Sequence, residues 1–316
     1  MKIDKLGRIV VAGMAEDHSG KSRLAVWRFT DIGRLDPDFG DRGFAKTELH
    51  AWGWAVDLAS DGTIVAAGFE GGNWQTAKHV VFVRFSHQGS ILETRKLESP
   101  LGGEHAVGLS ILAKRDGTIV IGGAGSDTQG VVHPVLWTLE GGKALPIPKG
   151  TKEARVNALL ETDDGVIAAG HLDWKKLAVW KDGGEPTVTD AGMGRSISST
   201  RNGFTVGGFR YLRKDDDSVR EEQAVISRFP EGSVTIFPKE EGVLNQESFA
   251  MARTGSVLRL AGYVGVKDGV RAALWGVSGE EVRLRLLPGS TGREDRAYAL
   301  TAYETGNRRL AIWSVP

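Results

Sequence analysis

The stretch that decides the fold is Gly62-TIVAAG, a glycine turn that leads into a short apolar run and closes on the small residue Gly68. Six further stretches of the 316-residue chain have the same form, at intervals of 38 to 55 residues: Gly7-RIVVAG, Gly117-TIVIGG, Gly165-VIAAG, Gly203-FTVGG, Gly255-SVLRLAG and Gly306-NRRLAI. Self-similarity at such a period is typical of repeat architectures. We therefore expect a chain built from copies of one supersecondary unit.

The second repeat shows what that unit is. Residues 52–58 alternate large and small side chains and precede Asp61-Gly62, a dipeptide favoured in tight hairpins because both positions accept a positive φ. Residues 63–68, 80–85 and 91–97 follow as three more strand-like runs, and no convincing amphipathic helix occurs anywhere. Four-stranded antiparallel units repeated radially are the blades of a β-propeller, because each blade buries both of its faces only between neighbours.

We predict an all-β chain that forms a single β-propeller domain over residues 1–316, with six four-stranded antiparallel blades. The sixth blade needs the run 297–303 to join the N-terminal strands, so that the two ends of the chain close the ring within one blade. Residues 308–313 then make one strand too many. A seventh, incomplete blade is the alternative.

One position in the third strand of each repeat is rich in tryptophan. Flat aromatic rings can stack on sugars, but a position that recurs once per repeat favours packing between blades. We therefore assign this column to the core: Trp27, Val83, Trp137, Trp180, Ser227 and Trp275.

Composition excludes several classes of protein. Lys and Arg number 40, as do Asp and Glu, so no net field attracts nucleic acid or an anionic membrane. The chain has no cysteine, which excludes disulfides, cysteine-zinc sites, iron–sulfur clusters and thiol catalysis. No run approaches the roughly 20 apolar residues of a membrane helix. We expect a soluble monomer, and leave its compartment open, including export after a signal peptide has been removed.

The first repeat carries a longer pattern: Gly7-RIVVAG, then Leu24-AVWRF, then Gly33-RLDPDFGDRGF, ending at Phe44. This string resembles the delta-sixty repeat family of bacterial β-propellers, whose units run from a glycine-led strand to an aromatic-Arg strand and a Gly-x-Leu-Asp-x-x-Phe-Gly turn. Only residues 7–44 match the full pattern, since the second repeat has Gly89-SILETRK in place of that turn. The resemblance implies a bacterial propeller, often part of an exported protein, and implies no catalytic motif.

A binding site is expected on the face that carries the blade-to-blade crossovers and the loops between second and third strands, because loops on a rigid scaffold vary freely. Those loops are long, as in residues 210–222, whereas the first hairpins are minimal. Residues just ahead of the innermost strands should surround the channel mouth, and residues of the shortest repeat should lie beside a groove. These candidates are His50, Trp52, His105, Glu153, Arg155, Asn157, Arg195, Glu247 and Arg296, with His171 and Trp174 from the shortest repeat.

His50 and His105 have similar offsets in adjacent repeats, and Glu153 is close to that offset in the next. Such a set suits a polar ligand, a general base with its partner, or a divalent metal, although a polar channel mouth is also the ordinary solvated state of a propeller. The acidic run 215–217 lacks the spacing of a calcium loop and is assigned to a solvated loop tip. No nucleophile elbow, phosphate loop or zinc-protease motif is present, and neither a cofactor nor a metal is expected.

These observations predict a ligand- or protein-binding propeller whose partner is a polar small molecule, a glycan or a protein. The alternative is an enzyme, a hydrolase or lyase that uses polar channel-mouth residues for acid–base chemistry.

Overall fold

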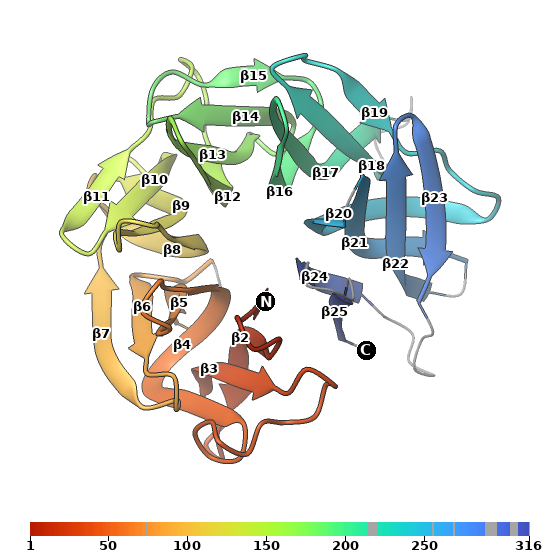
Figure 1. Cartoon of the computed structure of the whole chain (residues 1–316). Helices are drawn as coiled ribbons and strands as arrows, with labels where there is room; N and C mark the ends of the chain where they lie inside the picture. The colour runs from red at the N-terminus through yellow and green to blue at the C-terminus, as the bar shows by residue number, and fades with distance from the viewer. Residues whose placement is uncertain are drawn as a thin grey trace. The chain divides into compact units, whose positions relative to one another are not determined.

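The structure is a computed structural model that describes residues 1–316 except 72, 74, 214–219, 255, 268, 288–295, 304–308 and 316. All regular structure within the described residues is β-strand, and successive strands of each sheet pair in antiparallel fashion (Figure 1). No helix that could cross a membrane occurs in this part of the chain. The all-β prediction is confirmed.

The chain divides into two compact units, residues 1–168 with 180–186, and residues 169–179 with 187–316. The first unit begins with seven strands in consecutive order: β1 (Lys2–Ile3), β2 (Ile9–Glu16), β3 (Ser22–Phe29), β4 (Phe44–Leu58), β5 (Ile64–Glu70), β6 (Val80–Phe85) and β7 (Ile91–Leu97). A four-stranded sheet of order β11-β10-β9-β8 follows: β8 (Gly102–Ala113), β9 (Ile119–Asp127), β10 (Val132–Thr138) and β11 (Gly141–Ala144).

A sheet of order β12-β13-β14-β15 has residues in both units: β12 (Ala154–Thr162), β13 (Gly165–Leu172), β14 (Lys176–Lys181) and β15 (Thr187–Thr189). The second unit continues with β16 (Met193–Thr200), β17 (Gly203–Arg213), β18 (Arg220–Phe229) and β19 (Val234–Ile236) in one sheet. The next sheet consists of β20 (Val243–Thr254), β21 (Val257–Val266), β22 (Gly269–Ser278) and β23 (Glu281–Leu286), and the last pair is β24 (Arg296–Tyr303) with β25 (Arg309–Val315).

The first seven strands are two four-stranded units that share β4. Residues 44–46 and His50 of this strand pair with β3, and residues 51–58 pair with β5, with one register shift in each pairing. The change of partner falls between His50, opposite Arg23, and Ala51, opposite Glu70. The four-stranded antiparallel unit predicted from the repeat is therefore confirmed.

The two ends of the chain have the following strand partners. Lys2 and Ile3 pair with Val10 and Ile9, so the N-terminal residues themselves supply the strand beside β2. The C-terminal residues 309–315, part of which had no assigned place, form β25 beside β24. Closure of a ring by the two ends of the chain stays a prediction.

Hairpin turns form at the predicted Asp-Gly dipeptides, with a positive φ at the glycine but not at the aspartate. Asp61 Oδ1 accepts the backbone N–H of Thr63 at 2.9 Å, and Gly62 has a φ of +84°. Asp116 Oδ1 accepts the N–H of Thr118 at 2.8 Å in the next repeat. An aspartate that caps its own turn before a left-handed residue is the physical reason for the Asp-Gly preference.

The hairpin after Gly203 differs from the sequence expectation. Residues 210–222 were assigned to a loop, but β17 continues to Arg213 and β18 already begins at Arg220. These residues pair in register, with Tyr211 opposite Glu222. The acidic run 215–217 lies outside the described residues. The extended hairpin brings polar residues of β18 into the sheet, where one of them becomes part of a buried cluster described below.

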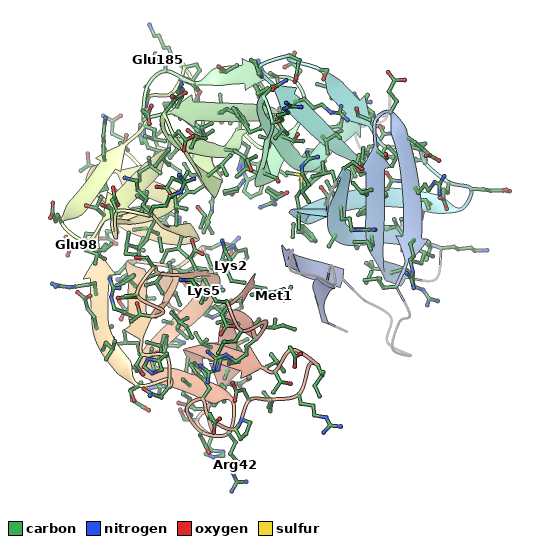
Figure 2. All side chains as sticks on the ribbon, in the orientation of Figure 1. Met1, Lys2, Lys5, Arg42, Glu98 and Glu185 are labelled. Carbon is green, nitrogen blue, oxygen red and sulfur yellow. The ribbon has the colours of Figure 1, made fainter. Side chains whose placement is uncertain are left out.

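The tryptophan column is core, as predicted. Trp137, Trp180 and Trp275 are at most 1% exposed, and Val83 and Ser227 are buried at the equivalent position. Trp137 Nε1 donates to the backbone oxygen of Glu98 at 2.8 Å, while the Glu98 side chain is exposed (Figure 2). Trp27 is half-buried and packs on Phe44 at a centroid distance of 5.2 Å.

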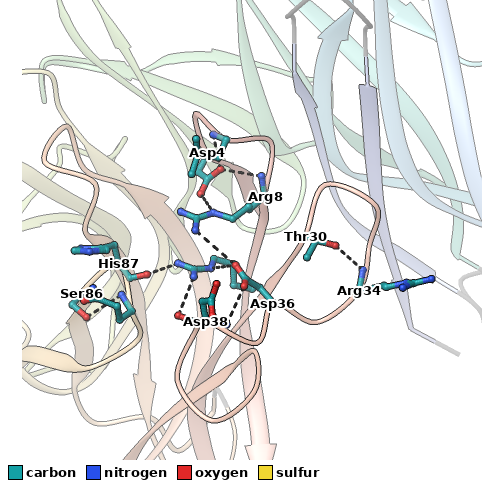
Figure 3. A network of polar contacts seen from close by, with 11 residues as sticks. Asp4, Arg8, Thr30, Arg34, Asp36, Asp38, Ser86 and His87 are labelled. Atoms are coloured by element: carbon teal, nitrogen blue, oxygen red, sulfur yellow. Dashed lines mark hydrogen bonds and ion pairs between the residues drawn. The ribbon is translucent and has the colours of Figure 1, made fainter.

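The residues of the first repeat that resemble the delta-sixty repeat pattern form a buried polar network (Figure 3). Arg28 Nε donates to Asp36 Oδ2 at 2.7 Å, and Arg28 is 2% exposed. The same guanidinium lies 4.7 Å from the Phe39 ring centroid and donates to the backbone oxygens of Asp38 and of His87, which belongs to the next repeat. The aromatic-Arg strand and the Leu-Asp-x-x-Phe-Gly turn therefore hold each other in place, so this pattern serves packing rather than chemistry.

Candidate functional site

An open hollow of about 670 Å³ lies in the first unit, where two loops between second and third strands meet a crossover. The loop between β5 and β6, the start of β8 and the turn between β9 and β10 form its wall. Its lining consists of Gln75, Thr76, Ala77, Lys78, Gly102, Gly103, Glu104, His105, Ser126, Asp127, Thr128 and Gly130. These are the kinds of loop on which a site was expected.

Two side-chain-capped turns shape the hollow. Asn73 Oδ1 accepts the backbone N–H groups of Gln75 and Thr76 at 2.9 and 3.0 Å. Asp127 Oδ1 accepts the N–H groups of Gln129 and Val131 at 2.8 and 2.9 Å. Short polar side chains that bond to the backbone two or more residues ahead fix a loop without help from a sheet. The walls of the hollow are thus locally determined.

Gly103 allows the start of β8 to approach the β9–β10 turn. A Cβ atom at Gly103 would lie 2.3 Å from Ser126 Oγ and 2.4 Å from the backbone oxygens of Ser126 and Asp127. Only glycine fits such a close approach. Pairing between β8 and β9 is interrupted at the same place, between Gly102 and Ala106, and this interruption leaves the intervening residues available to line the hollow.

His105 is held by two contacts within this interruption. Its backbone N–H donates to Ser126 Oγ at 3.1 Å, and its Nδ1 lies 3.1 Å from the backbone oxygen of Ala77. A carbonyl oxygen only accepts, so Nδ1 carries the hydrogen in this contact. Burial and the charge of Arg155 lower the pKa of His105, although Ala77 and Glu153 act in the opposite direction. The ring is therefore neutral at neutral pH, and Nε2 is a hydrogen-bond acceptor.

Glu153 and Arg155 lie beside His105. Arg155 Nε donates to Glu153 Oε1 at 2.6 Å, and Arg155 is 5% exposed. A bridge between Val132 and Glu153, with the Val132 N–H donating to the Lys152 oxygen at 3.1 Å, ties this segment to the start of β10. Burial lowers the pKa of Arg155, and the charge of Glu153 opposes that shift. Three of the predicted residues, His105, Glu153 and Arg155, are thus brought together.

The remaining predicted residues of the first unit lie elsewhere. His50 is exposed on β4, at the point where that strand changes partner. Trp52 is half-buried, stacks on Phe69 at a centroid distance of 5.9 Å and packs against an apolar cluster that includes Ala77, and it is not among the residues that line the hollow. Its Nε1 has no hydrogen-bond partner among the described residues. Asn157 is half-buried on β12.

The second unit holds the other candidates. His171 is fully buried, with its ring 4.8 Å from that of Trp174. Trp174 has a φ of 60° in the turn between β13 and β14. Arg195 and Glu247 are close enough for their charges to interact. Arg296 begins β24, and its side chain lies outside the described residues.

Two residues that sequence reasoning missed complete a polar cluster around Glu247. The Tyr263 hydroxyl oxygen lies 2.5 Å from Glu247 Oε1 and 2.9 Å from Glu222 Oε2. Burial and the neighbouring Glu222 raise the pKa of Glu247 to about 8. No local signal marks this cluster, because its members come from β18, β20 and β21.

Within the described part of the chain, no three His, Asp or Glu side chains gather as a metal site.

Known proteins resemble this chain in fold. The sequence model of a family described as "Domain of unknown function (DUF5122) beta-propeller" matches residues 7–39. No curated protein matches the chain.

Among solved structures, a chain of the mitotic checkpoint complex shares 12% identity and a TM-score of 0.56, covering 99% of this chain and 86% of that one. The β-propeller domain of the Trilobed protease from Pyrococcus furiosus shares 11% identity and a TM-score of 0.51, covering 99% and 91%. The acylaminoacyl peptidase of Pyrococcus horikoshii shares 13% identity and a TM-score of 0.51, and the match covers 98% of this chain and 50% of the peptidase chain. The fold is that of a β-propeller.

Proposed function

We propose that this chain is a binding propeller that takes a polar segment of a partner protein in the hollow lined by residues 75–78, 102–105 and 126–130. The carrying observation is the combination of a neutral acceptor, His105 Nε2, with two exposed charges of opposite sign, Lys78 and Glu104. Neither charge has an ion-pair partner among the described residues.

The chemistry of the lining supports a polypeptide as the ligand. A peptide offers backbone N–H groups to an acceptor such as His105 Nε2, and it can place an acidic side chain near Lys78 and a basic one near Glu104. Exposed charges add little free energy each, but a pattern of both signs selects a partner and orients it. The fold supports this proposal too, since one of the similar structures is part of a complex of proteins, the mitotic checkpoint complex.

The test is selection of binding peptides from a displayed random library on the wild-type protein. Each selected peptide is then measured against a Lys78→Ala/Glu104→Ala variant and against His105→Gln. We expect the selected peptides to bind both variants at least about tenfold more weakly than they bind the wild-type protein, which corresponds to about 1.4 kcal/mol of binding free energy. A matched control is Glu140→Ala/Lys149→Ala, which also removes one exposed charge of each sign from the first unit but lies outside the hollow. Selected peptides that bind all variants equally would place the site elsewhere.

An acid–base enzyme is the second candidate, and the state of His105 favours it. A histidine whose pKa is lowered keeps its basic form at neutral pH, and Glu153 with Arg155 lies beside it. The experiment is a screen of chromogenic ester and glycoside substrates with wild-type protein and His105→Gln. A turnover that the variant retains would exclude His105 as the base.

We further propose six four-stranded blades, with the β24–β25 pair as an addition to them, and a seventh, incomplete blade as the alternative. When β4 is counted in both of its sheets, six sheets have four strands each, and this count supports six blades.

The match over residues 7–39 and the Arg28–Asp36 turn support assignment to the delta-sixty repeat family. A monomer is expected, and sedimentation velocity tests that expectation.

A further inference from the structure

A second polar cluster lies in the other unit and has no part in the hollow. It joins Glu222 of β18, Glu247 of β20 and Tyr263 of β21. Glu247 and Tyr263 are 9% and 7% exposed, and Glu222 is half-buried. The cluster therefore spans two sheets, β16–β19 and β20–β23, both of which belong to the second unit.

Counting hydrogens shows that this arrangement needs a proton beyond that of the phenol. Tyr263 Oη contacts Glu247 Oε1 at 2.5 Å and Glu222 Oε2 at 2.9 Å. A phenol has one hydrogen, and an ionised carboxylate only accepts. With both carboxylates ionised, one of these two contacts would bring two acceptors together. One carboxyl group must therefore be protonated.

The surrounding charges determine which group keeps the proton. Burial raises the pKa of Glu247 to about 8, and the hydrogen bond and charge of Glu222 act in the same direction. From β16, the charge of Arg195 opposes this shift, and its guanidinium also lies 5.5 Å from the Phe209 ring centroid. Glu247 is the group that stays protonated at neutral pH.

Other charged groups of the neighbouring elements have partners of their own. On β17, Arg210 Nη2 donates to Gln223 Oε1 at 3.2 Å. On β18, Glu221 forms an ion pair with Lys239 at 2.8 Å. The strand β24 also packs on β20, and its one charged residue is Arg296, whose side chain lies outside the described residues.

We propose that the Glu222–Tyr263–Glu247 cluster is a pH-sensitive switch that ties β18 to β20 and β21 while it holds its proton. When Glu247 releases that proton to water, two carboxylates face each other in a poorly hydrated site and repel. The tie between the two sheets then loosens. This proposal is independent of the hollow, because no residue is shared.

The direction of the pH effect follows from linkage. The closed cluster binds its proton up to about pH 8, whereas an exposed glutamic acid releases it near 4.5. Between those values the opened state binds fewer protons than the closed one, so opening becomes easier by up to about tenfold per pH unit. Above about pH 8 both states are ionised, and the effect levels off.

The experiment is hydrogen–deuterium exchange of β18 and β20 from about pH 5 to about pH 9, with rates corrected for intrinsic exchange. In Glu247→Gln the carboxamide donates to the Tyr263 oxygen in place of the carboxyl proton, and the phenol still donates to Glu222, but the carboxamide does not titrate. The matched control is Glu240→Gln, a change of the same kind at an exposed position of the same unit. We expect wild type and Glu240→Gln to lose protection as the pH rises, and Glu247→Gln to keep it.

A second measurement needs no variant to fold. In wild-type protein, infrared spectroscopy should show a protonated carboxyl band that disappears with a midpoint near pH 8. Equal pH-dependent exchange in Glu247→Gln and wild type would overturn the proposal. So would the absence of any protonated carboxyl that titrates between about pH 6 and about pH 9.

Discussion

Arg28 and Asp36 form a buried ion pair, with Nε 2.7 Å from Oδ2 and side chains that are 2% and 7% exposed. The pair joins the third strand of the first repeat to the turn that follows it. It also reaches beyond the repeat, because the same guanidinium donates to the backbone oxygen of His87. The Leu-Asp-x-x-Phe-Gly turn therefore fastens one repeat to the next.

The first prediction concerns this ion pair. Asp36→Asn leaves the Arg28 charge buried without its counter-charge, and removal of one partner of a buried pair costs about 3–5 kcal/mol. Chemical denaturation measures this loss of the free energy of unfolding. The matched control is Glu281→Gln, which breaks the exposed pair with Arg283 and should cost less than about 1 kcal/mol. Equal effects of the two substitutions would show that the Arg28 network does not stabilise the fold.

A second prediction concerns the tryptophan column. Trp137→Ala and Trp180→Ala should each lower the free energy of unfolding by about 3–5 kcal/mol, the usual cost of truncating a buried aromatic ring. Trp137→Phe keeps most of the apolar contact and loses the hydrogen bond to the Glu98 oxygen, so a smaller loss is expected. If the alanine variants unfold at the same denaturant concentration as wild type, the rings are not core residues.

The third prediction concerns the titration of His105. Its pKa is lowered in the folded protein from the ordinary 6.5, so the unfolded chain binds a proton more readily than the folded one. Stability should therefore fall as the pH decreases below about 6.5, by up to about tenfold in the folding equilibrium per pH unit. NMR of the ring protons measures the midpoint directly, and it should lie below 6.5.

Two variants assign the cause of that shift. Glu153→Gln removes a charge that raises the pKa of His105, so the midpoint should move lower still. Arg155→Met removes a charge that lowers it, so the midpoint should move up. Shifts in the opposite directions, or none at all, would mean that Glu153 and Arg155 do not act on the His105 ring.

The fold could be predicted from the sequence because the sequence patterns that indicate it are local and recur in each repeat. The Asp61-Gly62 and Asp116-Gly117 turns are set by a side chain that bonds to its own backbone, and the column containing Trp137, Trp180 and Trp275 recurs at one strand position. The hairpin over residues 210–222 was missed because its strands extend past the apolar core. Polar residues there look like a loop when only hydrophobic alternation is considered.

The candidate site could be predicted only in part from the sequence. His105, Glu153 and Arg155 were predicted because each lies just ahead of an innermost strand, and the structure brings them together, whereas His50 shares the offset of His105 yet lies where β4 changes its partner from β3 to β5. Offset does not report whether a strand is interrupted by a close approach such as that of Gly103 to Ser126. The Glu222–Tyr263–Glu247 cluster depends on contacts between sheets, and no spacing within one repeat encodes it.

The strand β4, which two sheets share, has a consequence for how this gene could change. Between β7 and β8 the chain leaves one sheet and enters the next through residues 98–101, so a residue gained or lost there is absorbed by the connection. Residues 50 and 51 are joined without such a connection, since one pairs with β3 and the other with β5, and only the register shifts on either side, between Lys46 and His50 and between Gly53 and Ala55, can take up a gained or lost residue. A single-codon insertion or deletion that those shifts do not absorb would turn the following side chains of β4 to the opposite face. Changes in length are therefore accommodated more readily between β7 and β8 than within β4.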